Sequence, residues 1–183
     1  MMQKSGRYMS GIKTESTLKN DFVRWMLSEI SKAVSSSNKS IRPKTKQKEF
    51  ALQEFGYKCP YTGEDISDEE KIELDHIIPF NKEHCGLHLR GNLAATSRAI
   101  NNEKKSQKYD DFINTLQGLP QDRQDRINKI QAYMQENGYD ENSFDPGKIK
   151  EFVNKQHKEF EAYLERIMSR ISSQFEPKKR PSK

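Results

Sequence analysis

A stretch rich in turns and short β-like segments, residues 57–109, lies between two parts of the chain that have helical periodicity. Within it, Lys71 to Ile78 alternates apolar and polar side chains as a half-buried strand does, and Pro79 ends that strand. The segment from Leu93 to Lys105 has helical character. A small strand-containing core attached to helices is therefore expected, which makes the chain an α+β protein.

The flanking parts are predicted to be mostly helical. Apolar residues recur at steps of three and four from Thr17 to Val34. Further on, Pro120 starts a predicted helix, and Asp145-Pro146 offers an N-cap and an N1 proline for a last, long helix. That helix carries a heptad-like apolar seam from Ile149 to Ile171, which suits core packing or a contact between two copies. His157 is expected on its solvated surface.

Composition limits the core and indicates a polyanionic partner. Hydrophobic residues make up 32% of the chain and charged residues another 32%, so only a modest core is expected. The net charge is +5. Excess Lys and Arg suits a protein that binds nucleic acid, because neutralising phosphates releases condensed counterions. A merely basic surface would give the same composition.

The sequence also bears on where the protein works. No apolar run approaches the length that spans a bilayer, and residues 1–13 lack the apolar segment of a secretory signal. The two cysteines, Cys59 and Cys85, provide no disulfide framework and fit a reducing compartment. We therefore expect a soluble cytoplasmic protein with no membrane partner.

The residues with the most informative chemistry lie around the end of the predicted strand. Asp75 and His76 are adjacent there, and Asn92 and Asn102 follow at wider spacing. Adjacent strand residues project to opposite faces, but the twist at the end of a strand can bring both toward a shared site. Two strands with a loop, followed by a helix that bears Asn, resemble the ββα-metal hairpin of HNH endonucleases.

Two further motifs support this resemblance. Cys59-Pro60-Tyr61-Thr62-Gly63, together with Asp75-His76-Ile77-Ile78-Pro79-Phe80, resembles the HNH domains of RNA-guided CRISPR effector nucleases. Cys85-Gly86-Leu87-His88, with Asn92-Leu93, looks more like small stand-alone HNH endonucleases of phages and bacteria. The resemblance covers residues 47–109 and implies a ββα-metal (HNH) core embedded in a mostly α-helical protein.

The resemblance implies a role for each residue of the motif. His76 falls where the family has its general base, and Asp75 where it has a metal ligand. Asn92 falls at the Asn that braces the hairpin. Asn102 falls at the second protein ligand, with its neighbour Asn101 as the alternative.

These roles are chemically consistent. A hard cation such as Mg²⁺ or Mn²⁺ takes oxygen ligands, so one carboxylate and one amide suffice when phosphate and water supply the rest. The cation stabilises charge on the phosphate and on the departing 3′ oxygen, and a histidine with an ordinary pKa of about 6.5 accepts a proton from water. We therefore expect Asp75, His76 and Asn102 to surround one cavity that holds a cation and a water.

Basic residues near the motif are expected to contact DNA phosphates, the alternative being a solvated charged face. They are His88, Arg90, Arg98, Lys104, Lys105 and Lys108. His88 could instead assist at the metal or hydrogen-bond its own loop. A structural zinc is not expected, because Cys59, His84, Cys85 and His88 lack the usual spacing of zinc ligand pairs.

The chain therefore divides into four predicted parts. They are an N-terminal helical arm with a Ser-rich linker (1–41), an HNH catalytic core (42–109), a C-terminal helical region (110–176) and a basic tail (177–183). The predicted function is that of a divalent-metal-dependent DNA endonuclease, of restriction type or phage-encoded, which could form a homodimer through its C-terminal helix. The alternatives are a catalytically degenerate DNA-binding or packaging accessory protein, and a toxin-like HNH nuclease with an inhibitor partner.

Overall fold

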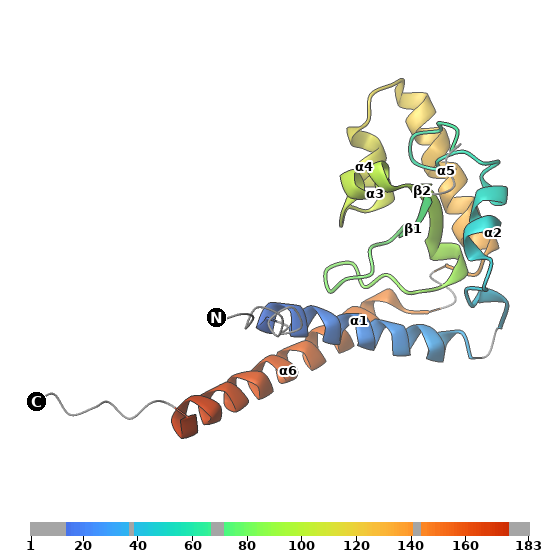
Figure 1. Cartoon of the computed structure of the whole chain (residues 1–183). Helices are drawn as coiled ribbons and strands as arrows, with labels where there is room; N and C mark the ends of the chain where they lie inside the picture. Colours follow the sequence, from blue (N-terminus) through green and yellow to red (C-terminus); the bar gives the residue numbers. More distant parts are fainter. Residues whose placement is uncertain (1–13, 37–38, 67–71, 141–143, 176–183) are drawn as a thin grey trace, which may run out of the picture.

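The computed structural model describes residues 14–36, 39–66, 72–140 and 144–175. Within these residues a two-stranded antiparallel sheet is surrounded by helices (Figure 1), so the α+β class is confirmed. None of the helices seen in those ranges combines the length and the apolar character needed to cross a membrane. The elements are α1 (Glu15–Val34), α2 (Gln47–Glu54), β1 (Ile72–His76), β2 (Leu93–Ser97), α3 (Arg98–Lys104), α4 (Tyr109–Thr115), α5 (Pro120–Glu136) and α6 (Pro146–Phe175).

The sheet and helix α3 form one continuous unit. β1 and β2 pair with Ile72 opposite Ser97 and His76 opposite Leu93. Ser97 is also the N-cap of α3, because its side chain accepts a hydrogen bond from the Ile100 N–H at 3.3 Å. The second strand therefore passes into the helix without a loop, and α3 packs against both strands.

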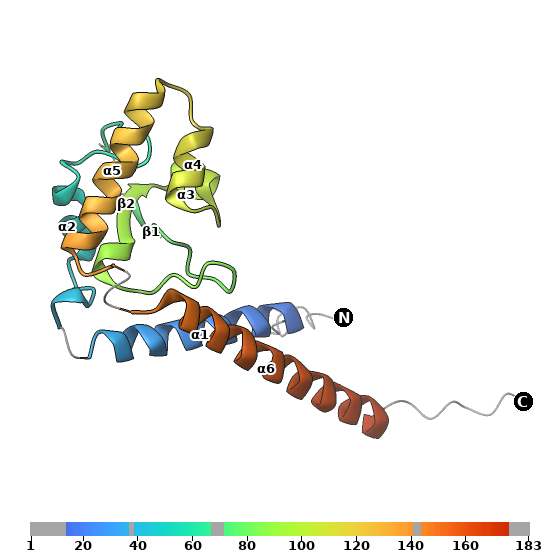
Figure 2. The same ribbon diagram turned by 180° about the vertical axis from the view of Figure 1, so that it is seen from behind.

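Four helices, α3 included, lie on the two sides of the β1–β2 hairpin. Figures 1 and 2 show α2 and α5 on one side of the hairpin, and α3 and α4 on the other. α2 packs on β2, where Ala94, Ala95 and Thr96 are all buried. The small side chains allow the helix to approach the strand closely, which explains why such a short sheet can be enclosed.

Helices α1 and α6 pack against each other beside the hairpin (Figure 1). Phe22 of α1 stacks on Phe160 of α6, with ring centroids 4.1 Å apart. The first half of α6 joins the main core through Ile149 and Val153, which are buried. The second half extends past α1 in both views (Figure 2), and several of its large apolar side chains are exposed.

His157 is buried in this helix pair, so the prediction that it is solvated is wrong. It is only 7% exposed, because it lies on the same face of α6 as Ile149 and Val153. Its Nδ1 is 3.3 Å from Glu161 Oε2, and Glu161 in turn is 3.3 Å from Lys19 Nζ of α1. Burial lowers the pKa of His157, the charges of Lys82 and Lys19 act in the same direction, and Glu161 opposes them.

The stability of the chain should therefore fall when the pH drops below about 6.5, the ordinary pKa of histidine. The folded pKa of His157 lies below the unfolded value, so between the two values the unfolded state binds more protons and acid favours unfolding. Melting temperatures at pH 7.5 and 5.5 measure this loss. His157→Gln should show a smaller loss than the wild-type chain, and an equal loss in both proteins would contradict the assignment.

Helices α5 and α6 confirm their predicted starts, whereas two other elements differ from expectation. Pro120 opens α5, and the Asp145 side chain accepts a hydrogen bond from the Lys148 N–H at 3.0 Å at the start of α6. α1 begins at Glu15 with Thr14 as N-cap, earlier than the predicted start at Thr17. The helix expected from Leu93 is wrong in its first part, since residues 93–97 form β2. The expected lead-in (1–13) and basic tail (177–183) lie outside the described residues.

Candidate functional site

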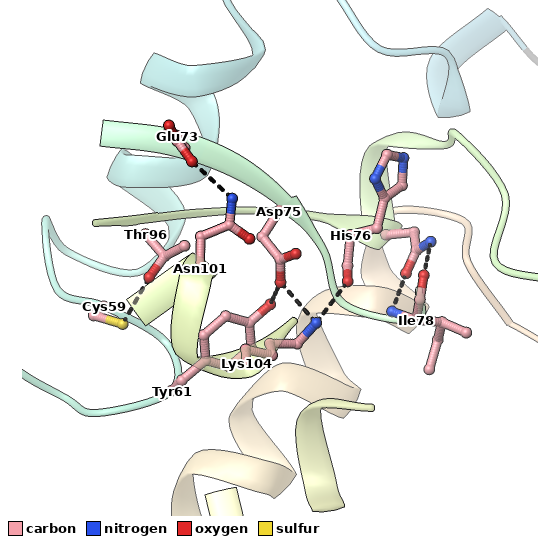
Figure 3. Close-up of polar contacts among 10 residues, drawn as sticks. Cys59, Tyr61, Glu73, Asp75, His76, Ile78, Thr96, Asn101 and Lys104 are labelled. Atoms are coloured by element: carbon pink, nitrogen blue, oxygen red, sulfur yellow. Dashed lines mark hydrogen bonds and ion pairs between the residues drawn. The ribbon is translucent and has the colours of Figure 1, made fainter. Parts of the chain in front are cut away.

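The carboxylate of Asp75, near the end of β1, is held by two side chains (Figure 3). Its Oδ2 accepts a hydrogen bond from the Tyr61 hydroxyl at 2.6 Å and lies 2.8 Å from Lys104 Nζ. Lys104 also donates to the His76 carbonyl at 3.0 Å. Tyr61 and Lys104 are fully buried and Asp75 is 8% exposed. The carboxylate is therefore fixed in one orientation, with Oδ1 accepting no hydrogen bond from the described residues.

Sequence reasoning missed the two groups that fix Asp75. Burial raises the pKa of Tyr61 well above its ordinary value, and the negative charge of Asp75 adds to this, so the phenol remains a donor. Lys104 supplies the compensating positive charge. The Tyr61-Thr62-Gly63 motif was the available signal for Tyr61, whereas nothing in the sequence distinguishes Lys104 from a surface lysine.

Helix α3 presents Asn101, rather than Asn102, to the hairpin. Asn101 Nδ2 donates to Glu73 Oε2 at 2.8 Å, and its amide oxygen points toward Asp75 in Figure 3. Glu73 and Asp75 are two residues apart, so they share one face of β1. Asn101 and Lys104 are three apart on α3 and share the helix face that meets it. Asn102 is exposed. Of the two asparagines, it is therefore the alternative, Asn101, that faces the strand carrying Asp75, and which of them binds a metal stays a prediction.

The ring of His76 lies on the other side of β1 from the Asp75 carboxylate (Figure 3). Its Nε2 is 3.1 Å from His88 Nδ1, and it stacks on Phe80 with ring centroids 4.9 Å apart. Alternation along the strand thus keeps Asp75 and His76 apart. The expectation that residues 75, 76 and 102 surround one cavity is wrong for this conformation.

The environment of His76 keeps its ring neutral. Burial lowers the pKa of His76 to about 3, and the charges of His88, Arg24 and Lys104 act in the same direction. Burial also lowers the pKa of His88. At neutral pH one ring therefore donates a hydrogen bond to the other, and the tautomers of the two histidines are coupled. A negatively charged phosphate nearby would offset the positive charges and make His76 a stronger base.

Asn92 braces the loop that follows β1. It is fully buried. Its Oδ1 accepts from the Ile78 N–H at 2.7 Å, and its Nδ2 donates to the carbonyls of Ile78 at 3.0 Å and Leu87 at 2.9 Å. These three hydrogen bonds connect the two ends of the loop just beyond His76. Asn92 therefore positions this loop rather than taking part in the chemistry.

The basic residues expected to contact DNA differ in how available they are. Lys104 is buried and paired with Asp75, so its predicted phosphate contact is wrong. The Arg90 guanidinium lies over the Phe50 ring, 5.0 Å from the centroid, and its Nε and Nη2 are buried. Arg98 is exposed, but its Nε lies 2.6 Å from Glu73 Oε1.

Besides Arg98, three of the basic residues predicted to contact DNA have charged or hydrogen-bond donor groups that solvent can reach. His88 and Lys105 are exposed and Lys108 is half-buried. Contact with phosphates therefore stays a prediction for these three and for the exposed Arg98, and His88 combines it with its hydrogen bond to His76.

A cavity of about 560 Å³ lies away from the Asp75 cluster. Its lining includes Ile78, His84, Cys85, Lys108 and Tyr139, but none of the proposed ligands. Across the described ranges, no three His, Cys, Asp or Glu side chains are placed to hold a metal ion together. A cation at Asp75 would therefore depend on an amide ligand and on ligands from outside the chain.

Comparison with known proteins finds no family model, no curated protein and no solved structure that matches this chain. What the protein does must therefore be inferred from its own residues. Asp75, His76 and Asn101, at one end of a hairpin that leads into a helix, are the groups from which that inference starts.

Proposed function

We propose that this chain is an HNH-type endonuclease that hydrolyses phosphodiester bonds in DNA with the help of a divalent cation. The observation that carries the proposal is the contact between β1 and α3, which puts Asp75 and Asn101 on one shared face. His76 follows Asp75 directly, and Asn92 braces the loop beyond it. A hairpin followed by a helix supplies the same groups in the ββα-metal arrangement that the sequence resembles, and β1, β2 and α3 occur in that order.

The donor atoms on this face fit a hard cation such as Mg²⁺ or Mn²⁺. Asp75 Oδ1 and the Asn101 amide oxygen are oxygen donors, and neither accepts a hydrogen bond from the described residues. Tyr61 and Lys104 orient the carboxylate through its other oxygen, as partners behind a metal ligand commonly do. Two protein ligands suit Mg²⁺, which keeps several waters. A bound cation would supply charge neutralisation at the scissile phosphate and the departing 3′ oxygen.

In this proposal His76 takes the proton from the attacking water. In an in-line displacement the attacking and leaving oxygens lie on opposite sides of phosphorus. His76 is the last residue of β1 and Asp75 the one before it, so in this proposal the scissile phosphate lies at that end of the strand, where both groups are nearby. The hydrogen bond between the two rings couples the tautomer of His76 to that of His88. The expected products, from the family resemblance, are 5′-phosphate and 3′-hydroxyl ends.

Asn101→Ala should raise the Mg²⁺ concentration needed for half-maximal cleavage by at least about 10-fold, the lower end of what losing a supporting metal contact costs. Asn102→Ala is the matched control, because it removes an identical side chain from the exposed face of the same helix. Its Mg²⁺ dependence should equal that of the wild type. Cleavage of supercoiled plasmid across a Mg²⁺ titration provides the measurement. The reverse result, with Asn102→Ala impaired and Asn101→Ala normal, would exclude Asn101 as the ligand.

The biological setting and the partner are proposals of the same kind. A restriction-type or phage-encoded enzyme acting on DNA in the cytoplasm fits the chemistry. A homodimer through α6 is also proposed, since two copies related by a two-fold axis could cut both strands of a palindrome. The exposed apolar side chains available for it on this helix are Phe152, Tyr163, Met168, Ile171 and Phe175. No described feature favours the accessory protein or the toxin-like nuclease over this proposal.

A further inference from the structure

Helix α1 is fastened to the loop that carries the partner of His76. The Ser31 hydroxyl accepts a hydrogen bond from the His88 N–H at 2.8 Å and donates to the Leu27 carbonyl within the helix at 2.6 Å. Val23 and Leu27 anchor the same helix in the core. The position of α1 relative to His76 is therefore set by buried contacts, although α1 lies far from the hairpin in the sequence.

Arg24, one turn of helix from Leu27, points to the His76 side of the hairpin. Its Cζ lies 5.9 Å from the centre of the Phe80 ring, and Phe80 stacks on His76 with an angle of 13° between the ring planes. The positive charge of Arg24 also contributes to lowering the pKa of His76. Arg24 is exposed, so its guanidinium is accessible from solvent.

This availability distinguishes Arg24 from the arginines of the hairpin region. Arg98 is paired with Glu73, and two nitrogens of Arg90 are buried. A guanidinium over an aromatic ring retains its charge and its N–H groups at the edge, and these can bind two phosphate oxygens at once. Arg24 is thus an exposed cation held against Phe80, beside the base of the proposed reaction.

We propose that Arg24 of α1 binds a backbone phosphate of the DNA on the His76 side of the scissile bond. This inference rests on the proposed function for the identity of the substrate, and it adds α1, outside the hairpin, to the substrate-binding surface. Arg24 and His76 both contact the Phe80 ring, so the three side chains lie together at one edge of the site.

Binding and cleavage measured on the full chain test the inference. Arg24→Gln should lower the slope of log Kobs against log salt concentration by about one, the change expected for one phosphate contact, when duplex DNA is bound in EDTA. The single-turnover cleavage rate in Mg²⁺ should fall by about 10-fold or more, but by less than the roughly 10²- to 10³-fold lost with a donor to the reacting group itself, because Arg24 binds a neighbouring phosphate. Arg24→Lys should recover part of both, because it restores the charge without the planar fork.

Lys32→Gln is the matched control, since it removes one positive charge from an exposed position two turns along α1. Its salt slope and rate should match those of the wild type. If the wild type cleaves and Arg24→Gln has an unchanged salt slope and rate, the inference on Arg24 is wrong while the nuclease stands. If the wild type binds DNA without cutting it, the proposed function fails, and the salt slope alone decides for or against the Arg24 contact. An absence of DNA binding would overturn both.

Discussion

His76→Ala should lower the single-turnover rate of DNA cleavage by about 10²- to 10⁴-fold, the usual contribution of a general base. The loss is expected because His76 is the proposed base and its ring is held in place by two contacts. His88 Nδ1 lies 3.1 Å from its Nε2, and Phe80 stacks on it. DNA affinity should stay close to the wild-type value and the variant should remain folded, because the ring contacts Phe80 and the exposed His88 rather than the fully buried core. Quantifying product under enzyme excess separates this chemical defect from a binding defect.

His84→Ala is the matched control for that experiment. His84 belongs to the same loop between β1 and β2, but it lines the separate cavity beside Cys85. Its removal should leave the rate within a few-fold of wild type. Full activity of His76→Ala would remove the proposed base, and equal loss in the two variants would indicate damage to the loop rather than to the chemistry.

Lys104→Met should destabilise the metal-free chain by about 3–5 kcal/mol, because it leaves the buried Asp75 carboxylate without its counter-charge. Methionine has similar length and keeps the packing of the alkyl stem. For a chain of this size, 1 kcal/mol corresponds to roughly 2–4 °C in melting temperature, so a fall of about 6–20 °C is expected. Thermal unfolding in EDTA, followed by circular dichroism, measures it.

A double-mutant cycle assigns the effect to the ion pair. Asp75→Asn combined with Lys104→Met removes both charges, so the double variant should be more stable than the sum of the two single losses predicts. Lys105→Met, on the exposed neighbour, controls for the loss of a positive charge. A melting temperature of Lys104→Met within measurement error of the control would show that the pair contributes no stability.

Local signals predicted the helices at the C-terminal side well. Pro120 and Asp145-Pro146 are start signals that act through the backbone of their own first turn, so neighbouring elements do not change them. The strand at Asp75 was also predictable, because alternation and the proline after it are both local. In contrast, β2 consists of Leu93 followed by four small residues that could form either structure, and its pairing with β1 decides in favour of a strand.

The details of the site depended on contacts that a sequence does not contain. Asn101 and Asn102 differ by one residue, which on a helix is a rotation of about 100°, and the capping of α3 by Ser97 determines which one meets β1. Lys104 has the residue type of a surface cation, yet it is buried against Asp75. Arg24 comes close to Phe80 only through the packing of α1, more than fifty positions earlier in the chain.

The most direct test of the central claim is incubation of the purified wild-type chain with supercoiled plasmid DNA, with Mg²⁺ and with EDTA. We expect nicked or linear product in Mg²⁺ and intact plasmid in EDTA. We also expect that Asp75→Asn and His76→Ala, each shown to be folded, leave the plasmid intact in Mg²⁺. Intact plasmid with the wild type in both Mg²⁺ and Mn²⁺, or equal cleavage by the wild type and both variants, would contradict the claim that these residues form a metal-dependent nuclease site.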